Sequence, residues 1–309
     1  MERGGKADAR DSASRITAVR VWTQRSRYPE TVKRNLDYRD HSRSLGQNRY
    51  VYAVASRRAG GLSIGVNMNP DKVCNFDCPY CQVDRTIPGG APDMDVERLG
   101  DELESLLGLA STDALWGTPP FDTVAEPLRH VADLAFSGDG EPTTPQAFPA
   151  AARRVRDVLK TRDIGVPMRL ITNATMFDRP RVREALDLFD ELWCKLDAGT
   201  AEFFARVDGT RYPYTRLLEN LAAVARERPI VIQSLFFTHD GAPPPRDEID
   251  AYLERLSDLR NAGGTIDHVQ VYTVVRKPAN ASVGPLRHEQ LEEIASRVRA
   301  LGARAEVYD

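Results

Sequence analysis

Short apolar runs alternate along the chain with longer segments in which apolar residues recur every three or four positions. The short runs, rich in Val, Ile, Leu and Phe, predict buried strands, and the longer segments predict amphipathic helices. The predicted strands are Tyr50–Val54, Leu62–Asn67, Val131–Phe136, Met168–Thr172, Leu192–Leu196, Ile230–Phe237, His268–Val274 and a short last one at Ala305–Tyr308. The predicted helices are Met94–Leu109, with Asp93 as its N-cap, Pro149–Thr161, Pro180–Phe189, Tyr214–Arg228, Asp247–Ala262 and Arg287–Leu301.

The order of these elements predicts an α/β fold with a parallel sheet, because strands that alternate with helices form βαβ units. About six such units fit between Leu62 and Leu301, which is too few for a closed eight-stranded barrel. A partial barrel and an open sheet both agree with this pattern. Residues 110–130 interrupt it and predict an inserted loop. We assign residues 50–309 to this domain and residues 1–49 to a separate N-terminal extension.

Polar and glycine-rich residues follow the predicted strands directly. In barrels and in open parallel sheets, functional residues gather at the carboxyl ends of the strands. The residues in these positions are Asn67, Ser137 to Glu141, Thr172, Asn173, Asp197 and Arg276. This pattern predicts a single functional face.

Three of the four cysteines, Cys74, Cys78 and Cys81, crowd into the loop after the strand at Leu62–Asn67. Three thiolates on one short loop can converge on a metal. A structural zinc site takes four protein ligands, and the chain offers no second cysteine pair. A [4Fe–4S] cluster held by three thiolates keeps one iron open for an exogenous ligand. Zinc completed by a distant ligand remains the alternative.

Charge is distributed unevenly around a net value of −3. Residues 1–60 contain 14 Lys and Arg against 6 Asp and Glu, and the remainder contains 28 against 39. A basic N-terminal segment can contact the phosphates of RNA, or it can be a solvated tail. No apolar run reaches the length of a membrane span, and the first residues lack the apolar core of a secretory signal. We therefore expect a cytoplasmic protein with no membrane contact.

The cysteine motif CNFDCPYC, with Tyr80 directly before the third cysteine, resembles that of the radical S-adenosylmethionine (radical SAM) superfamily. Ser137 to Pro142 resembles the glycine-glycine-glutamate motif of that superfamily, with Asp139 where most members have glycine. The GxGEP form is similar to one branch, the small iron–sulfur oxidoreductases related to the catalytic domain of tRNA wyosine (4-demethylwyosine) synthases. This likeness extends over residues 41–285 and includes Leu196 to Gly199, Tyr272-Thr273 and Arg276 to Pro278.

The resemblance implies a partial (β/α)6 TIM-like barrel with one [4Fe–4S] cluster, three of whose irons are bound by Cys74, Cys78 and Cys81. S-adenosylmethionine would chelate the fourth iron and, after reduction, yield a 5′-deoxyadenosyl radical that takes hydrogen from a substrate. It also implies an external electron donor of the flavodoxin or ferredoxin type. The cofactor-binding residues that it implies are the main chain of Gly138, Asp139, Gly140 and Glu141 for the methionyl ammonium, Tyr80 behind the adenine, and Asn173 and Asp197 for ribose or carboxylate.

Two further residues are candidates for catalysis, Lys195 and Arg276. Alternation along the strand places Lys195 on the inner face with Asp197, and it places Cys194 on the outer face as a core thiol. A lysine Schiff base has been considered in the related tRNA enzymes, whereas pairing of Lys195 with Asp197 or with a cofactor carboxylate is the more conservative interpretation. Arg276, like Gln233, either contacts substrate or makes structural hydrogen bonds.

The function predicted from these features is that of a radical SAM enzyme acting on an RNA base or a small metabolite. Two alternatives stay open. One is an activase that installs a glycyl radical on a partner protein. The other is a non-catalytic protein that binds an iron–sulfur cluster or zinc.

Overall fold

The computed structural model describes residues 46–56 and 59–309, with the side chain of Asp113 excepted. The chain divides into two units, residues 1–34 and 35–309, and every described residue belongs to the second. The predicted N-terminal extension therefore lies outside the described residues except for its last four, and its separation at residue 49 stays a prediction.

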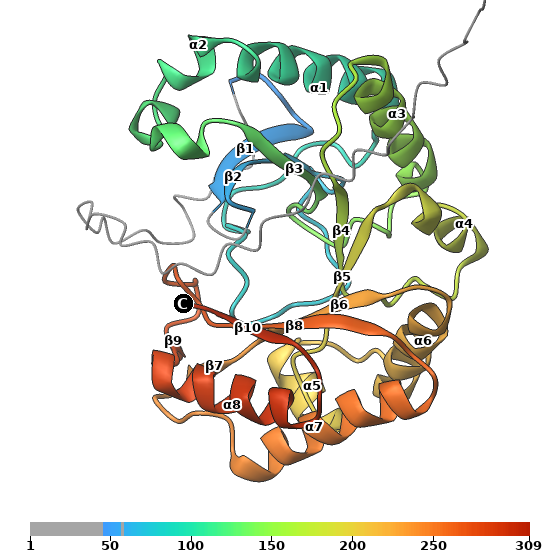
Figure 1. The fold of residues 1–309 in the computed structure, drawn as a ribbon, viewed down its shortest axis with the longest axis vertical. Coiled ribbons are helices and arrows are strands. Elements are labelled where there is room, and N and C mark those ends of the chain that lie inside the picture. The colour runs from blue at the N-terminus through green and yellow to red at the C-terminus, as the bar shows by residue number, and fades with distance from the viewer. Residues whose placement is uncertain (1–45, 57–58) are drawn as a thin grey trace, which may run out of the picture. The chain divides into compact units, whose positions relative to one another are not determined.

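One curved sheet of eight strands forms the centre of the described region (Figure 1). The strand order follows the sequence, and only the β1–β2 pair is antiparallel. Since β1 and β10 are the two edges, the sheet is not closed. The strands are β1 (Val51–Ser56), β2 (Gly61–Val66), β3 (Val131–Phe136), β4 (Met168–Thr172), β5 (Glu191–Lys195), β6 (Ile230–Leu235), β8 (Ile266–Tyr272) and β10 (Ala305–Tyr308).

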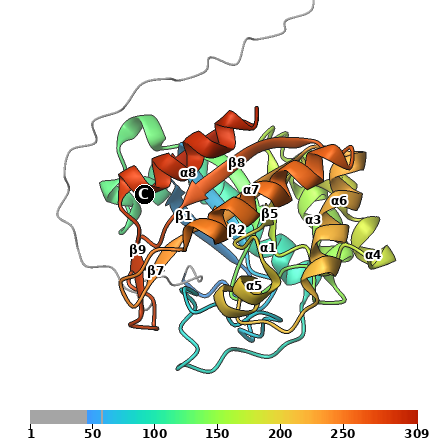
Figure 2. The same ribbon diagram turned by 90° about the horizontal axis from the view of Figure 1, so that it is seen from below.

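Helices connect the parallel strands and lie outside the sheet, as α7 and α8 show beside β8 in Figure 2. Between β2 and β10 the chain makes six β-to-α passages, so the predicted partial (β/α)6 barrel is confirmed. No described helix has both the length and the apolarity that a membrane span needs. The helices are α1 (Val96–Ala110), α2 (Asp113–Trp116), α3 (Phe148–Thr161), α4 (Pro180–Arg183), α5 (Ala201–Val207), α6 (Tyr214–Glu227), α7 (Arg246–Asn261) and α8 (His288–Ala300).

Several predicted boundaries are wrong in detail. The N-cap of α1 is Asp95, not Asp93, because the Asp95 carboxylate accepts from the Arg98 backbone at 3.0 Å. The helix predicted at Pro180–Phe189 is only α4 followed by a 3₁₀ turn at Leu186–Leu188. The inserted loop contains α2 and two more 3₁₀ turns. A small hairpin, β7 (Phe237–His239) with β9 (Val283–Pro285), was not predicted.

The two faces of the sheet differ in chemistry. Outward residues such as Leu134, Cys194 and Ile232 are fully buried in the apolar core beneath the helices, which confirms Cys194 as a core thiol. Register aligns Lys195 with Gln233 and Gln233 with Gln270 across the inner face. Gln233 donates to Gln270 at 2.8 Å, so Gln233 makes the structural hydrogen bond that was one of its two predicted roles. The interior of the barrel is therefore polar.

An ion-pair cluster occupies the amino-terminal end of this interior. Arg169 on β4 pairs with Asp133 on β3 and makes two hydrogen bonds to Glu191 on β5, at 2.9 and 3.1 Å. The guanidinium also lies 4.9 Å from the centre of the Trp193 ring. Only 3% of the Asp133 side chain is exposed, so the buried carboxylate needs the Arg169 cation to compensate its charge.

We expect Arg169→Ala to lower the free energy of unfolding by about 3–5 kcal/mol, since it leaves the Asp133 charge buried without its cation. Urea denaturation of the cluster-free protein measures this. The control is Arg183→Ala, which removes an exposed pair with Glu227 and should cost under about 1 kcal/mol. Equal losses in the two variants would contradict a special role for Arg169.

Candidate functional site

The cysteine loop, residues 67–95, connects the carboxyl end of β2 to α1 and has little regular structure of its own. Cys74, Cys78 and Cys81 are all partly exposed, and the backbone turns tightly where Cys81 N–H donates to Cys78 O at 2.9 Å. Such an irregular loop is positioned by what packs against it. Four neighbouring segments pack against the cysteine loop.

The loop after β3 makes the first contact, through its two glycines. A Cβ at Gly140 would collide with the Val73 carbonyl, directly before Cys74, and a Cβ at Gly138 would collide with Asn67. Asp139 lies between them and is held by Asn67, which donates to its carboxylate at 2.7 Å and accepts from its backbone at 3.0 Å. These glycines are therefore needed for close backbone approach, and Asp139 is compatible with this arrangement.

Glu141, from the same loop, is 4% exposed and cross-links β3 to β4. Its carboxylate accepts from the Asn173 backbone at 2.7 Å and from the hydroxyls of Thr143 and Thr172, both at 2.6 Å. Burial raises the pKa of Glu141, and these donors counteract part of the effect. The side chain thus fixes the main chain of the glycine-rich loop.

The end of β4 makes the second contact with the cysteine loop. Asn173 donates to the Asn75 side chain at 2.8 Å, and Asn75 donates in turn to Thr175 at 2.7 Å. Asn75 is the residue directly after Cys74. In this structure Asn173 orients the cysteine loop through its side chain.

The third contact comes from the segment after α5, where Asp77 N–H donates to Asp208 O at 3.2 Å. Gly209 has a positive φ of 57°, and a Cβ there would collide with the Asp77 carbonyl. The Cys78 sulfur lies 3.6 Å from both Asp208 O and its carboxylate. Burial, and after it the Asp208 charge, raise the pKa of Cys78 well above its usual value. Any metal that binds here must therefore displace a proton from this thiol.

A buried charged network extends from this point into the barrel. The Tyr80 hydroxyl donates to Asp197 and lies 3.0 Å from Asp208, so it bridges two carboxylates. The Lys195 amine lies 3.1 Å from Asp197 and 4.9 Å from the Tyr80 ring centre. Burial works against the Lys195 cation, but Asp197 and other neighbouring groups overcome it and raise the pKa of Lys195 well above its usual value. The predicted pairing of Lys195 with Asp197 is confirmed.

Asp208 and Gly209 are among the site residues that sequence reasoning missed. They follow α5, a helix that was not predicted, and they approach Cys78 from 130 residues away. The only local signal is the Asp-Gly pair, which indicates a turn and no more.

The fourth contact is made near the carboxyl end of β8. Gln82, next to Cys81, donates to the Arg276 carbonyl at 3.2 Å. Arg276 is partly buried, so the structure brings this predicted residue beside the cysteine loop.

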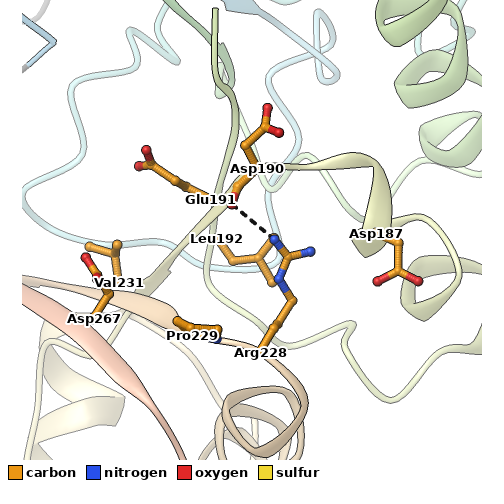
Figure 3. Close-up of a pocket in the computed structure, with 8 residues that line it drawn as sticks. All are labelled: Asp187, Asp190, Glu191, Leu192, Arg228, Pro229, Val231 and Asp267. Atoms are coloured by element: carbon orange, nitrogen blue, oxygen red, sulfur yellow. Dashed lines mark hydrogen bonds between the residues drawn. The ribbon is translucent and has the colours of Figure 1, made fainter. Parts of the chain in front are cut away.

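Two cavities lie at opposite ends of the parallel strands. A polar one of about 470 Å³ opens at the amino-terminal ends of β5, β6 and β8, opposite the cysteine loop (Figure 3). Most of its charged groups have partners, since Asp190 pairs with Arg156, Asp267 pairs with His268, and Arg228 donates to backbone carbonyls. An apolar cavity of about 380 Å³ lies at the carboxyl ends instead, lined by residues of α5, Leu235 to Phe237 and Pro243 to Pro245.

The cysteine arrangement can be tested against the two metal sites that the sequence allows. Within residues 46–56 and 59–309, no three Cys, His, Asp or Glu side chains gather closely enough to hold one metal ion. A zinc ion needs its thiolates at about 2.3 Å from a single centre. The thiolates of an iron–sulfur cluster bind different irons and so lie farther apart. Three thiolate donors on one loop are chemically compatible with an iron–sulfur cluster.

Comparison with known proteins agrees with this geometry. A family model described as the Radical SAM superfamily matches residues 68–227, just over half of the chain. The chain is 30% identical over 169 residues to a UPF0026 protein of Helicobacter pylori, a match that covers 54% of this chain and 47% of that one. The chain thus spans about half the length of this relative.

Two solved structures resemble the fold, both at 15% identity. The structure of TYW1 with a lysine-pyruvate adduct bound matches with a TM-score of 0.54 over 77% of this chain and 73% of that one. A radical SAM methyltransferase from Sphaerobacter thermophilus matches with a TM-score of 0.58 over 84% and 68%. The two structures share the partial-barrel fold, and the family model, which matches over half of the chain, shows that the chain belongs to the radical SAM superfamily.

Proposed function

We propose that Cys74, Cys78 and Cys81 bind three irons of one [4Fe–4S] cluster and that the protein uses S-adenosylmethionine for hydrogen abstraction from an RNA base or a small metabolite. The observation that carries this proposal is the three-cysteine loop, held at the carboxyl ends of the strands by four separate contacts. When bound, the cluster supplies the electron that cleaves S-adenosylmethionine to methionine and a 5′-deoxyadenosyl radical. We further propose a flavodoxin- or ferredoxin-type electron donor.

The protein's own contribution is to bind and orient. Beside Gly140 lies Asn69, which is 5% exposed and whose side-chain oxygen has no hydrogen-bond partner in the structure. A buried acceptor of this kind is costly unless a donor arrives. We assign it, with the main chain of residues 138–141, to the methionyl ammonium, a group with three donors.

For the adenine we propose the apolar cavity next to Tyr80. The Phe237 ring lines this cavity and lies 5.5 Å from the Tyr80 ring, so Tyr80 supports the cavity from behind. Aromatic and apolar walls of this kind suit a planar heterocycle. Water would be excluded from the reacting end of the cofactor by the same residues.

Lys195 is proposed to act as a fixed cation and not as a Schiff-base nucleophile. TYW1, which the fold resembles, was solved with a lysine-pyruvate adduct, and Schiff-base formation requires a neutral amine. Here the ion pair with Asp197 and the face of Tyr80 both favour the protonated form. Such a cation can orient the carboxylate of a cofactor or substrate, with Arg276 at the rim as a second candidate contact.

The assignment of the cluster predicts the outcome of two cysteine substitutions. After anaerobic reconstitution the wild-type protein should hold about four irons per chain, and Cys78→Ala should lose the cluster and the formation of 5′-deoxyadenosine. Cys194→Ala is the matched control, because Cys194 is a fully buried core thiol and its loss should spare both. Normal 5′-deoxyadenosine formation by Cys78→Ala would contradict the assignment.

Glu141→Ala should lower the rate of S-adenosylmethionine cleavage by about tenfold or more, because it releases the donors that fix the glycine-rich loop. Glu141→Gln keeps the shape and an acceptor oxygen, and we expect a smaller loss. The measurement is 5′-deoxyadenosine formed against S-adenosylmethionine concentration. Full rate and full affinity in Glu141→Ala would show that the motif is wrongly assigned.

Incubation with pyruvate followed by borohydride should leave Lys195 of the wild-type protein unmodified at neutral pH, since the Lys195 amine is held as a cation. Asp197→Asn removes the carboxylate that pairs with the Lys195 cation, and it should increase any trapping at Lys195. Peptide mass spectrometry locates the modified residue. Stoichiometric trapping on Lys195 of the wild-type protein would refute the fixed-cation role.

A further inference from the structure

Arg85 lies four residues after Cys81 and contacts the sulfur of that cysteine directly. Its Nη1 donates to Cys81 Sγ at 3.3 Å, and its Nε donates to the Lys72 carbonyl at 3.3 Å. The second bond fixes the guanidinium to the segment that leads into Cys74. Arg85 is thus held at the open edge of the cysteine loop, with a third of its side chain exposed.

The charge of Arg85 is only weakly compensated by its neighbour. Asp77 lies 4.0 Å away, but 87% of the Asp77 side chain is exposed and the pair is therefore largely screened by water. Cys74 also lies within the electrostatic influence of Arg85. Two of the three cysteines are thus under the influence of one cation.

Cys78 has the opposite surroundings. Its sulfur lies 3.6 Å from the Asp208 carboxylate, and the cation of Lys195 is already paired with Asp197. The loop therefore presents an electropositive edge at Cys81 and an electronegative one at Cys78. A hydrogen bond to a cluster sulfur and a nearby cation both stabilise the reduced cluster, which carries one more negative charge.

We propose that Arg85 tunes the redox centre of this site: its charged hydrogen bond to the Cys81 sulfur raises the reduction potential of the bound cluster. The inference rests on the proposed function, because it requires a cluster on the three cysteines. Arg85 acts through Cys81 and is therefore a positioning and tuning residue, not a catalytic one. Its substitution makes the cluster harder to reduce.

The test is a redox titration of the reconstituted full-length protein with dithionite and mediators, followed by the EPR signal of the reduced cluster. In Arg85→Gln the ratio of reduced to oxidised cluster at a fixed potential should fall about tenfold, a shift of ~59 mV for a one-electron couple. Arg85→Lys keeps the charge but not the fork of donors, and its shift should be smaller. Arg304→Gln is the control, because Arg304 lies at the opposite end of the sheet and pairs with Glu306.

A potential in Arg85→Gln that equals that of the wild type and of Arg304→Gln overturns the inference. If Arg85→Gln incorporates less iron, the titration still reports the fraction that is loaded, and Arg85→Lys provides a second value. A wild-type protein that assembles no cluster contradicts the proposed function instead. The two failures are therefore distinguishable.

Discussion

The close approach of three backbone segments is the constraint on which this site depends. The cysteine loop lacks helical or strand hydrogen bonds to hold its shape, so its geometry comes from contact with its neighbours. Gly140 and Gly209 lie against the carbonyls of Val73 and Asp77, where any side chain would collide. Each contact lies directly before one of the first two cysteines along the chain. Glycine at these positions therefore has a steric function, and a binding role for the main chain near Gly140 is compatible with it.

The polar interior of the barrel imposes a second requirement, which the ion pairs meet. Arg169 neutralises Asp133 at the amino-terminal end, and Lys195 neutralises Asp197 near the cysteine loop. Buried charges without partners would be costly, so each cation stabilises the fold as well as shaping the local field. Tyr80 connects the second pair to Asp208 and so to Cys78. A change at Lys195 is therefore expected to reach the cysteine loop without direct contact.

Local sequence patterns predicted the partial barrel because each strand and its helix carry their own periodicity, as at Met168–Thr172, where the predicted and observed bounds agree. The cysteines and the pairing of Lys195 with Asp197 were predictable for the same reason, since each lies within a few residues of its partner. Asp208 was not, because its contact with Cys78 spans 130 residues and arises only when α5 packs beside the loop. The short helix α5 and the three-residue strand β7 are too brief to show a period.

The EPR spectrum of the reduced, reconstituted protein, recorded before and after addition of S-adenosylmethionine, tests the central claim most directly. A cluster held by three cysteines leaves one iron for the cofactor, so the signal of a single [4Fe–4S] centre should appear and then change shape when S-adenosylmethionine binds. A cluster signal that S-adenosylmethionine leaves unaltered, or the absence of any iron–sulfur signal, would contradict it.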